Sequence, residues 1–161
     1  MITGLIIGKF IPPHAGHLDL IEFGSKRCDK LIVGLSTCIE DQIPPQVRYD
    51  WMKELTKKYK NVVLEKISDD LPRNKKPTKS GSIKWAEYCL KRFGKIDKIF
   101  SSEKYGEYMA KRLGAKNCIF DFKREKHPVS GTAIRNNPRE NWKFIPDIVK
   151  PYFQEFGQGV H

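Results

Sequence analysis

Short apolar segments alternate with longer amphipathic segments along this chain, and that alternation restricts the folds it can adopt. The apolar segments are rich in Ile, Leu, Val and Phe and predict strands at residues 4–8, 30–35, 62–67, 98–101 and 117–121. The segments between them predict helices at residues 16–26, 45–59, 82–93 and 103–113. Strands that are apolar on both faces and alternate with helices form parallel sheets covered on both sides. With right-handed crossovers, the sequence predicts an α/β fold, a Rossmann-like, doubly wound, five-stranded parallel sheet.

The chain length of 161 residues predicts one domain. We expect a Rossmann-like core at residues 1–129 and a C-terminal segment of short helices at residues 130–161, which contains several prolines. The basic, acid-free segment at residues 73–82 predicts a mobile surface loop. In doubly wound sheets, ligands bind beyond the carboxyl ends of the strands. The residues that follow each strand are therefore the candidates for a functional site.

Charge and the length of the apolar runs narrow the range of partners. The chain has 30 Lys and Arg against 19 Asp and Glu, and the net charge of +11 favours polyanionic ligands. Apolar runs fall far short of the ~20 residues that a membrane span needs, and no basic segment precedes the apolar start as in a secretory signal. The widely spaced cysteines predict neither a zinc site nor a disulfide scaffold, but reduced, mostly buried thiols in a cytoplasmic protein.

The segment GKFIPPHAGHL at residues 8–18 predicts a phosphate site after the first strand. It matches neither a P-loop nor the glycine-rich loop of dinucleotide-binding domains. His14 and His17 are three residues apart at the start of a predicted helix, so both can face one ligand. Gly16 allows close approach to the backbone, and the helix N-terminus attracts anions, with Lys9 at the edge. The alternative is two surface histidines in a loop, which the strand–turn–helix context disfavours.

The segment PVSGTAIR at residues 128–135 predicts a second anion site. Ser130 is a natural N-cap, and the N–H groups of Gly131 and Thr132 follow it in the first turn. Arg135 lies three residues beyond Thr132 on the same helix face and supplies a forked cation. The alternative is a capped helix that carries a solvated arginine.

Together the two segments resemble the HxGH nucleotidyltransferase α/β-phosphodiesterase superfamily, through G-x-F-x-P-x-H-x-G-H after the first strand and S-G-T-x-I-R near the end. Residues 134–153 are similar to the adenylyltransferase part of bifunctional bacterial enzymes that join nicotinamide-mononucleotide (NMN) adenylyltransferase to ribosylnicotinamide kinase. The chain lacks the kinase P-loop and the repressor segment that some relatives carry. We therefore expect the transferase activity alone.

The resemblance implies transfer of AMP from ATP to NMN, giving NAD and pyrophosphate. It implies Mg²⁺ bound mainly through the ATP phosphates, no metal ligands from the protein, and catalysis by positioning and charge without a covalent intermediate. The implied catalytic residues are His14, His17 and Arg135. The implied ATP-binding residues are Gly8, Lys9, Phe10, His14, Gly16, His17, Asp121, Arg124, Ser130, Gly131, Thr132 and Arg135.

The resemblance further implies an NMN site formed by Trp85, Arg48 and Ser102. Trp85 would stack on the nicotinamide ring, because a pyridinium over an indole face is a favourable cation–π pair; the alternative is a core tryptophan. Arg48 would lie near the substrate phosphates; the alternative is a solvated helix residue. Trp51 and Trp142 are expected to pack against other side chains.

Two other functions fit parts of the sequence. One is an adenylyl- or cytidylyltransferase for another phosphorylated acceptor, such as phosphopantetheine. The other is a basic nucleic-acid-binding protein, although the basic residues are scattered and form no recognisable nucleic-acid motif. We therefore expect ATP and NMN as partners, with neither nucleic acid nor a membrane, and a homo-oligomer is compatible with the sequence.

Overall fold

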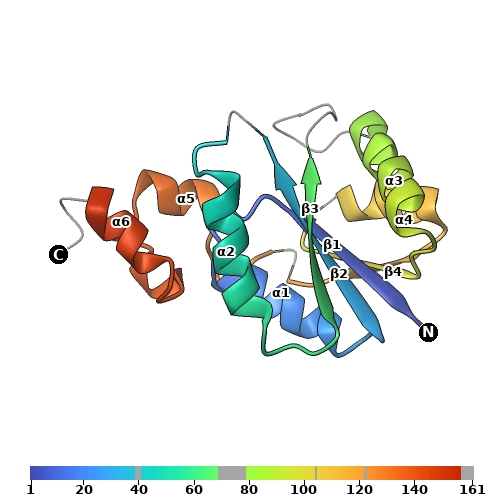
Figure 1. Ribbon diagram of the computed structural model, residues 1–161, viewed down its shortest axis with the longest axis horizontal. Helices are drawn as coiled ribbons and strands as arrows, with labels where there is room; N and C mark the ends of the chain where they lie inside the picture. Colours follow the sequence, from blue (N-terminus) through green and yellow to red (C-terminus); the bar gives the residue numbers. More distant parts are fainter. Residues whose placement is uncertain (39–40, 69–78, 104, 122, 157–161) are drawn as a thin grey trace.

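A computed structural model describes residues 1–38, 41–68, 79–103, 105–121 and 123–156. Its centre is a five-stranded parallel sheet in the order β3-β2-β1-β4-β5 (Figure 1). The strands are β1 (Thr3–Gly8), β2 (Lys30–Thr37), β3 (Val62–Ser68), β4 (Lys98–Ser101) and β5 (Lys116–Ile119). The chain builds outward from β1 to β3 and then returns to add β4 on the other side of β1. The predicted α/β fold class is confirmed, and the strand order reverses between β1 and β4.

Helices cover both faces of the sheet (Figure 1). They are α1 (Ala15–Ser25), α2 (Pro45–Thr56), α3 (Lys79–Phe93), α4 (Tyr105–Leu113), α5 (Gly131–Asn136) and α6 (Lys150–Phe156), with a 3₁₀ turn at Trp142–Phe144. Neighbouring side chains of β1 point to opposite faces: Ile6 packs in one core cluster with Ile21 of α1 and Met52 of α2, whereas Leu5 packs in another with Ala86 of α3. Because both faces are buried, the strands are apolar at consecutive positions.

The C-terminal segment packs beside α2, as Figure 1 shows for α5 and α6. A third core cluster joins Ile134, Val149 and Phe153 to Trp51 of α2 and to Ile11 in the β1–α1 loop. Burial of these apolar side chains fixes α5 beside the loop that follows β1. Two segments that are more than 100 residues apart in sequence therefore meet at the end of β1.

Several element boundaries differ from the predictions. The third helix begins at Lys79, so the last residues of the predicted basic loop are helical, while residues 69–78 lie outside the described residues. The second helix ends at Thr56, and the fourth begins at Tyr105. The fifth strand ends at Ile119, and Asp121, which has a left-handed backbone with φ of 47°, lies in the loop that follows.

The cysteine prediction needs a correction. All four cysteines are free thiols, but only Cys89 is buried, whereas the other three are half-buried. Cys28 and Cys118 lie at the edge of the first core cluster, where they pack against it without being fully covered. Among the described residues, no helix combines the length and apolarity that crossing a membrane would require.

Candidate active site

A cavity of about 830 Å³ opens where the strand order reverses, beyond the carboxyl ends of β1 and β4. Its walls come from the β1–α1 loop, the end of β2, the first turns of α3 and α5, and the loops after β4 and β5. All of the predicted site residues except Arg48 line it: Gly8, Lys9, Phe10, His14, Gly16, His17, Trp85, Ser102, Asp121, Arg124, Ser130, Gly131, Thr132 and Arg135. The fold therefore gathers the two predicted anion sites around one space.

His14 and His17 form a stacked pair at the start of α1. His14 is the N-cap, and its Nδ1 accepts a hydrogen bond from the Gly16 backbone N–H at 3.1 Å. Nδ1 of His17 accepts one from the His14 backbone N–H, also at 3.1 Å. The ring centroids are 3.7 Å apart, with 24° between the planes. Because each Nδ1 is an acceptor, the proton of each neutral ring resides on Nε2, which makes Nε2 a hydrogen-bond donor.

The same geometry disfavours positive charge on this pair. Burial, together with the positive charges of Arg124 and His127, lowers the pKa of His14 to about 3. Burial and the neighbouring His14 and Arg124 hold the pKa of His17 well below its usual value. In the free protein at neutral pH both rings are neutral, so each ring presents a hydrogen-bond donor and not a positive charge. Contact of these donors with a phosphate stays a prediction.

Phe10 packs against the His17 ring of the stacked histidine pair. Its side chain is buried and its ring meets the His17 ring edge-on, with centroids 4.7 Å apart. The backbone of Phe10 has a φ of 53°, which aims its ring back toward the strand end. A Cβ added at Gly8 would lie 3.0 Å from Phe10 Cζ, so any larger residue at that position would crowd the ring and require it to shift slightly.

The α5 segment is anchored directly to the β1–α1 loop. Nη1 of Arg135 donates to the Ile11 carbonyl at 2.5 Å, and Nη2 donates to Thr132 Oγ1 at 3.2 Å. Ser130 caps α5 by accepting from the Ala133 N–H, as predicted. A Cβ added at Gly131 would lie 2.6 Å from the Ile11 carbonyl oxygen, so only glycine permits this approach of the two backbones. Anion binding by the N–H groups of this turn stays a prediction.

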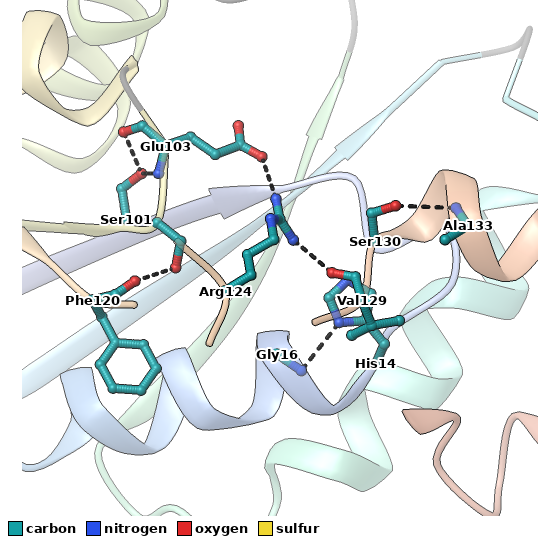
Figure 2. A network of polar contacts seen from close by, with 10 residues as sticks. His14, Gly16, Ser101, Glu103, Phe120, Arg124, Val129, Ser130 and Ala133 are labelled. Atoms are coloured by element: carbon teal, nitrogen blue, oxygen red, sulfur yellow. Dashed lines mark hydrogen bonds and ion pairs between the residues drawn. The ribbon is translucent and has the colours of Figure 1, made fainter. Parts of the chain in front are cut away.

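Arg124 joins the loops after β4 and β5 to the second motif. Figure 2 shows its side chain between Glu103 and Val129, next to the cap formed by His14. It donates to the Val129 carbonyl at 2.8 Å and to Glu103 Oε1 at 3.3 Å. The carboxylate of Asp121 accepts from the backbone N–H groups of Glu125 and Lys126, so it shapes the loop that carries Arg124. Ser102 donates its hydroxyl to the Phe120 carbonyl at 2.5 Å and so ties β4 to β5.

The expectation for Arg48 needs a correction. Its side chain is fully buried, so it is neither a solvated helix residue nor part of the cavity wall. Its guanidinium donates to the carboxylate of Asp41 at 2.6 Å and to the carbonyls of three residues, Lys9, Ser36 and Ile43. Protein acceptors therefore engage all three guanidinium nitrogens, and Arg48 holds the loop after β1 to the end of β2.

Trp85 both packs against the core and lines the cavity, so it has features of a core residue and of a ligand-contacting residue. It is half-buried and packs against the core cluster of α3 and α4, with its ring edge-on to Tyr88 at 6.0 Å. Its remaining surface lines the cavity. Trp51 is buried and Trp142 packs against the third cluster, as expected for packing residues. Stacking of Trp85 on a ligand stays a prediction.

The comparison with protein families decides the relationship. Residues 5–137 match the cytidylyltransferase-like family, which covers both anion-site segments and most of the sheet. The chain belongs to the cytidylyltransferase-like family. It is a nucleotidyltransferase-type domain by descent, as the sequence motifs predicted.

Two relatives of this cytidylyltransferase-like chain carry names that refer to NAD biosynthesis or to nicotinamide nucleotides. It is 29% identical to the trifunctional NAD biosynthesis/regulator protein NadR of Escherichia coli over 93% of this chain and 40% of that protein. It is 25% identical to nicotinamide-nucleotide adenylyltransferase of Thermococcus sibiricus over 96% of this chain and 84% of that protein. The chain thus spans less than half the length of NadR.

Solved structures support the fold of this cytidylyltransferase-like domain. A crystal structure of a NadR protein in complex with NAD and AMP-PNP superposes with a TM-score of 0.70 at 22% identity, covering 94% of this chain and 46% of that one. A NadR structure in complex with NR gives a TM-score of 0.71 at 23% identity, over 94% of this chain and 45% of that one.

Sequence reasoning missed several cavity residues of this cytidylyltransferase-like domain. Asp19 and His127 line the cavity and pair with each other although they are 108 positions apart. Each lies close to a recognised motif, Asp19 two residues after His17 and His127 three before Ser130. That adjacency was the only available signal. Among the described residues, no three His, Cys, Asp or Glu side chains are grouped as a metal ion would require.

Proposed function

We propose that this protein is an NMN adenylyltransferase, which transfers AMP from ATP to nicotinamide mononucleotide and releases pyrophosphate. The observation that carries the proposal is the stacked His14 and His17 pair, whose Nε2 donors share one cavity with Arg124, Arg135 and Trp85. The matches to NadR and to the Thermococcus enzyme support NMN as the acceptor.

The reaction is one in-line displacement at phosphorus. An oxygen of the NMN 5′-phosphate forms a bond to the α-phosphorus while the bond to the bridging oxygen breaks, and pyrophosphate leaves with the electron pair. The attacking phosphate oxygen is already deprotonated, so no general base is required. Catalysis then depends on alignment of the two phosphates and on donors at the oxygens where charge develops.

The chain's own residues suit these tasks. The two Nε2–H groups of His14 and His17 would donate to the α-phosphate oxygens, and their positions are preset by the backbone bonds at Nδ1. Arg124 and Arg135 are fixed by carbonyl acceptors, so their charge faces the phosphates with little loss of side-chain freedom. Magnesium would enter as MgATP, because the described residues offer no cage of ligands for it.

A phosphopantetheine adenylyltransferase is the second candidate. The chain is 42% identical to phosphopantetheine adenylyltransferase of Clostridium botulinum, but over only 57 residues, 34% of this chain and 36% of that protein. This match covers about a third of each protein, whereas the matches to the NAD-related relatives cover more than nine-tenths of this chain.

An acceptor panel tests the proposal. Purified protein would be incubated with MgATP and, separately, NMN, nicotinate mononucleotide or phosphopantetheine, and pyrophosphate and adenylylated product would be measured. We expect pyrophosphate and NAD with NMN. Pyrophosphate released only with phosphopantetheine, or with no acceptor in the panel, would contradict the proposal.

A further inference from the structure

A third histidine faces the same cavity and is held differently from the stacked pair. His127 lies in the loop between β5 and α5, lines the cavity, and has a side chain that is one-third exposed. Its Nδ1 contacts Oδ2 of Asp19, which projects from the second turn of α1. Lys126 lies 3.8 Å from the other carboxylate oxygen of Asp19. The pair thus links the two elements that carry the anion-site motifs.

The partner of Nδ1 determines the chemistry of each ring. In His14 and His17, Nδ1 accepts from a backbone N–H, so a neutral ring presents Nε2–H. In His127, Nδ1 faces a carboxylate and must carry a proton, because two acceptors would repel each other. Nε2 becomes a donor only when the ring is an imidazolium, and the Asp19 carboxylate then balances its charge. When Nε2 of His127 donates to an anion, the ring therefore does so as an imidazolium paired with Asp19.

The surroundings place this cation beside the phosphate-binding elements. Electrostatic repulsion from His127 contributes to the lowered pKa of His14. The same loop carries Arg124, and Val129 accepts from Arg124 just before the Ser130 cap. Nε2 of His127 has no hydrogen-bond partner within the part of the chain that the structure describes, whereas Phe144 contacts the ring edge-on at 5.9 Å.

We propose that His127 binds the leaving pyrophosphate of the nucleotide, through Nε2–H, and that Asp19 is the positioning residue that orients the ring. The α-phosphate would meet the neutral donors of His14 and His17, and the β- and γ-phosphates would meet the charged donor. Charged hydrogen bonds to the leaving group strengthen as its bond to the α-phosphorus breaks. This inference rests on nucleotidyl transfer, as in the proposed function, but does not depend on which acceptor is used.

Direct binding of inorganic pyrophosphate, ATP and AMP tests the assignment without any acceptor. In His127→Asn the amide nitrogen stands near the Nδ1 position, so the contact with Asp19 is kept and the group at Nε2 is lost. Calorimetry should show magnesium pyrophosphate and MgATP binding weakened by roughly 10-fold or more, the range for one charged hydrogen bond, while AMP binding stays within about 2-fold. His127→Gln, whose amide nitrogen reaches toward the Nε2 position, should recover part of the loss.

Variants at Asp19 test the positioning role. Asp19→Asn keeps an acceptor for Nδ1–H and should retain much of the pyrophosphate affinity, whereas Asp19→Leu should lose it and leave AMP binding unchanged. Asp147→Asn removes an almost fully exposed carboxylate on the C-terminal segment and is the matched control. In the reverse reaction, His127→Asn should raise the KM for pyrophosphate and leave that for the dinucleotide unchanged.

Two results would overturn the inference. One is unchanged pyrophosphate affinity in His127→Asn. The other is an equal loss of AMP and pyrophosphate binding in both His127→Asn and Asp19→Leu, which would show that the pair only holds the fold together. If the pyrophosphate effect is present but no NAD is formed from NMN, the acceptor assigned above is wrong and the role of His127 stands.

Discussion

The guanidinium of Arg48 and the carboxylate of Asp41 form an ion pair of 2.6 Å in which the side chains are 0% and 3% exposed. Oδ2 of Asp41 also accepts from the Cys38 backbone N–H at 2.7 Å. With the carbonyls of Lys9 and Ser36, this pair joins the ends of β1 and β2 at the cavity wall. Arg48 therefore positions cavity-lining residues without lining the cavity itself.

Loss of this buried ion pair should destabilise the protein strongly. Arg48→Ala removes the guanidinium that pairs with the buried Asp41 carboxylate and donates to three carbonyls, and we expect the free energy of unfolding to fall by roughly 3–5 kcal/mol. Urea denaturation measures it. Arg112→Ala, which removes a half-exposed pair with Glu87, is the control and should cost less than about 1 kcal/mol. Full stability of Arg48→Ala, with weakened acceptor binding, would restore the ligand-contact interpretation.

His17 and Arg135 should act mainly on the transition state. Removal of one fixed donor from a charge-stabilising site typically lowers turnover by ~10²–10³. His17→Ala and Arg135→Ala should each lower kcat by about that factor. Circular dichroism should show both variants folded. Arg139→Ala, an exposed arginine four residues after Arg135, should retain normal kcat. Near-normal turnover in both site variants would mean that the two motifs do not form one ATP site.

Trp85 should contribute to acceptor binding more than to ATP binding. If its exposed face stacks on nicotinamide, Trp85→Ala should weaken NMN binding by about 0.5–2 kcal/mol, and Trp85→Phe should recover part of this. Measuring the Kd values for NMN and ATP together with the Tm distinguishes ligand stacking by Trp85 from a packing role. Trp142→Phe, outside the cavity, should change neither Kd. A collapse of Tm with parallel loss of both affinities would assign Trp85 to the core.

The stability of the protein should depend on His14 in mildly acidic solution. Its pKa is about 3 in the folded protein and near 6.5 in the unfolded chain, so the unfolded chain takes up the proton first as the pH falls. The contribution is fully present above pH 6.5 and is lost progressively between 6.5 and 3. At pH 4.5 the loss from His14 alone should be roughly 2–3 kcal/mol.

His14→Asn tests this linkage, because asparagine caps helices well and does not titrate. Urea denaturation at pH 7.5 and pH 4.5 should show a smaller drop in unfolding free energy for the variant than for the wild-type protein. The carboxylates that titrate in this range are common to both proteins. An identical drop in the two would show that His14 is not held neutral by the fold.

Local patterns in the sequence were sufficient for the fold class and for the two segments, residues 8–18 and 128–135, that border the cavity. Strands buried on both faces require consecutive apolar residues, as at Leu5 and Ile6, and such runs are visible without a structure. The caps at His14 and Ser130 are equally local, because each bonds to a backbone N–H within three residues.

Contacts between distant segments were decided only by the tertiary structure. Arg48 is a charged residue on an amphipathic helix, yet its guanidinium is buried by acceptors as far along the chain as Lys9, so no pattern around residue 48 could predict its role. His127 meets Asp19 across 108 positions, and their pairing follows from the packing of the C-terminal segment against the β1–α1 loop. Periodicity and capping report what a residue does with its neighbours in the chain, whereas charge pairing depends on which segments the buried apolar surface brings together.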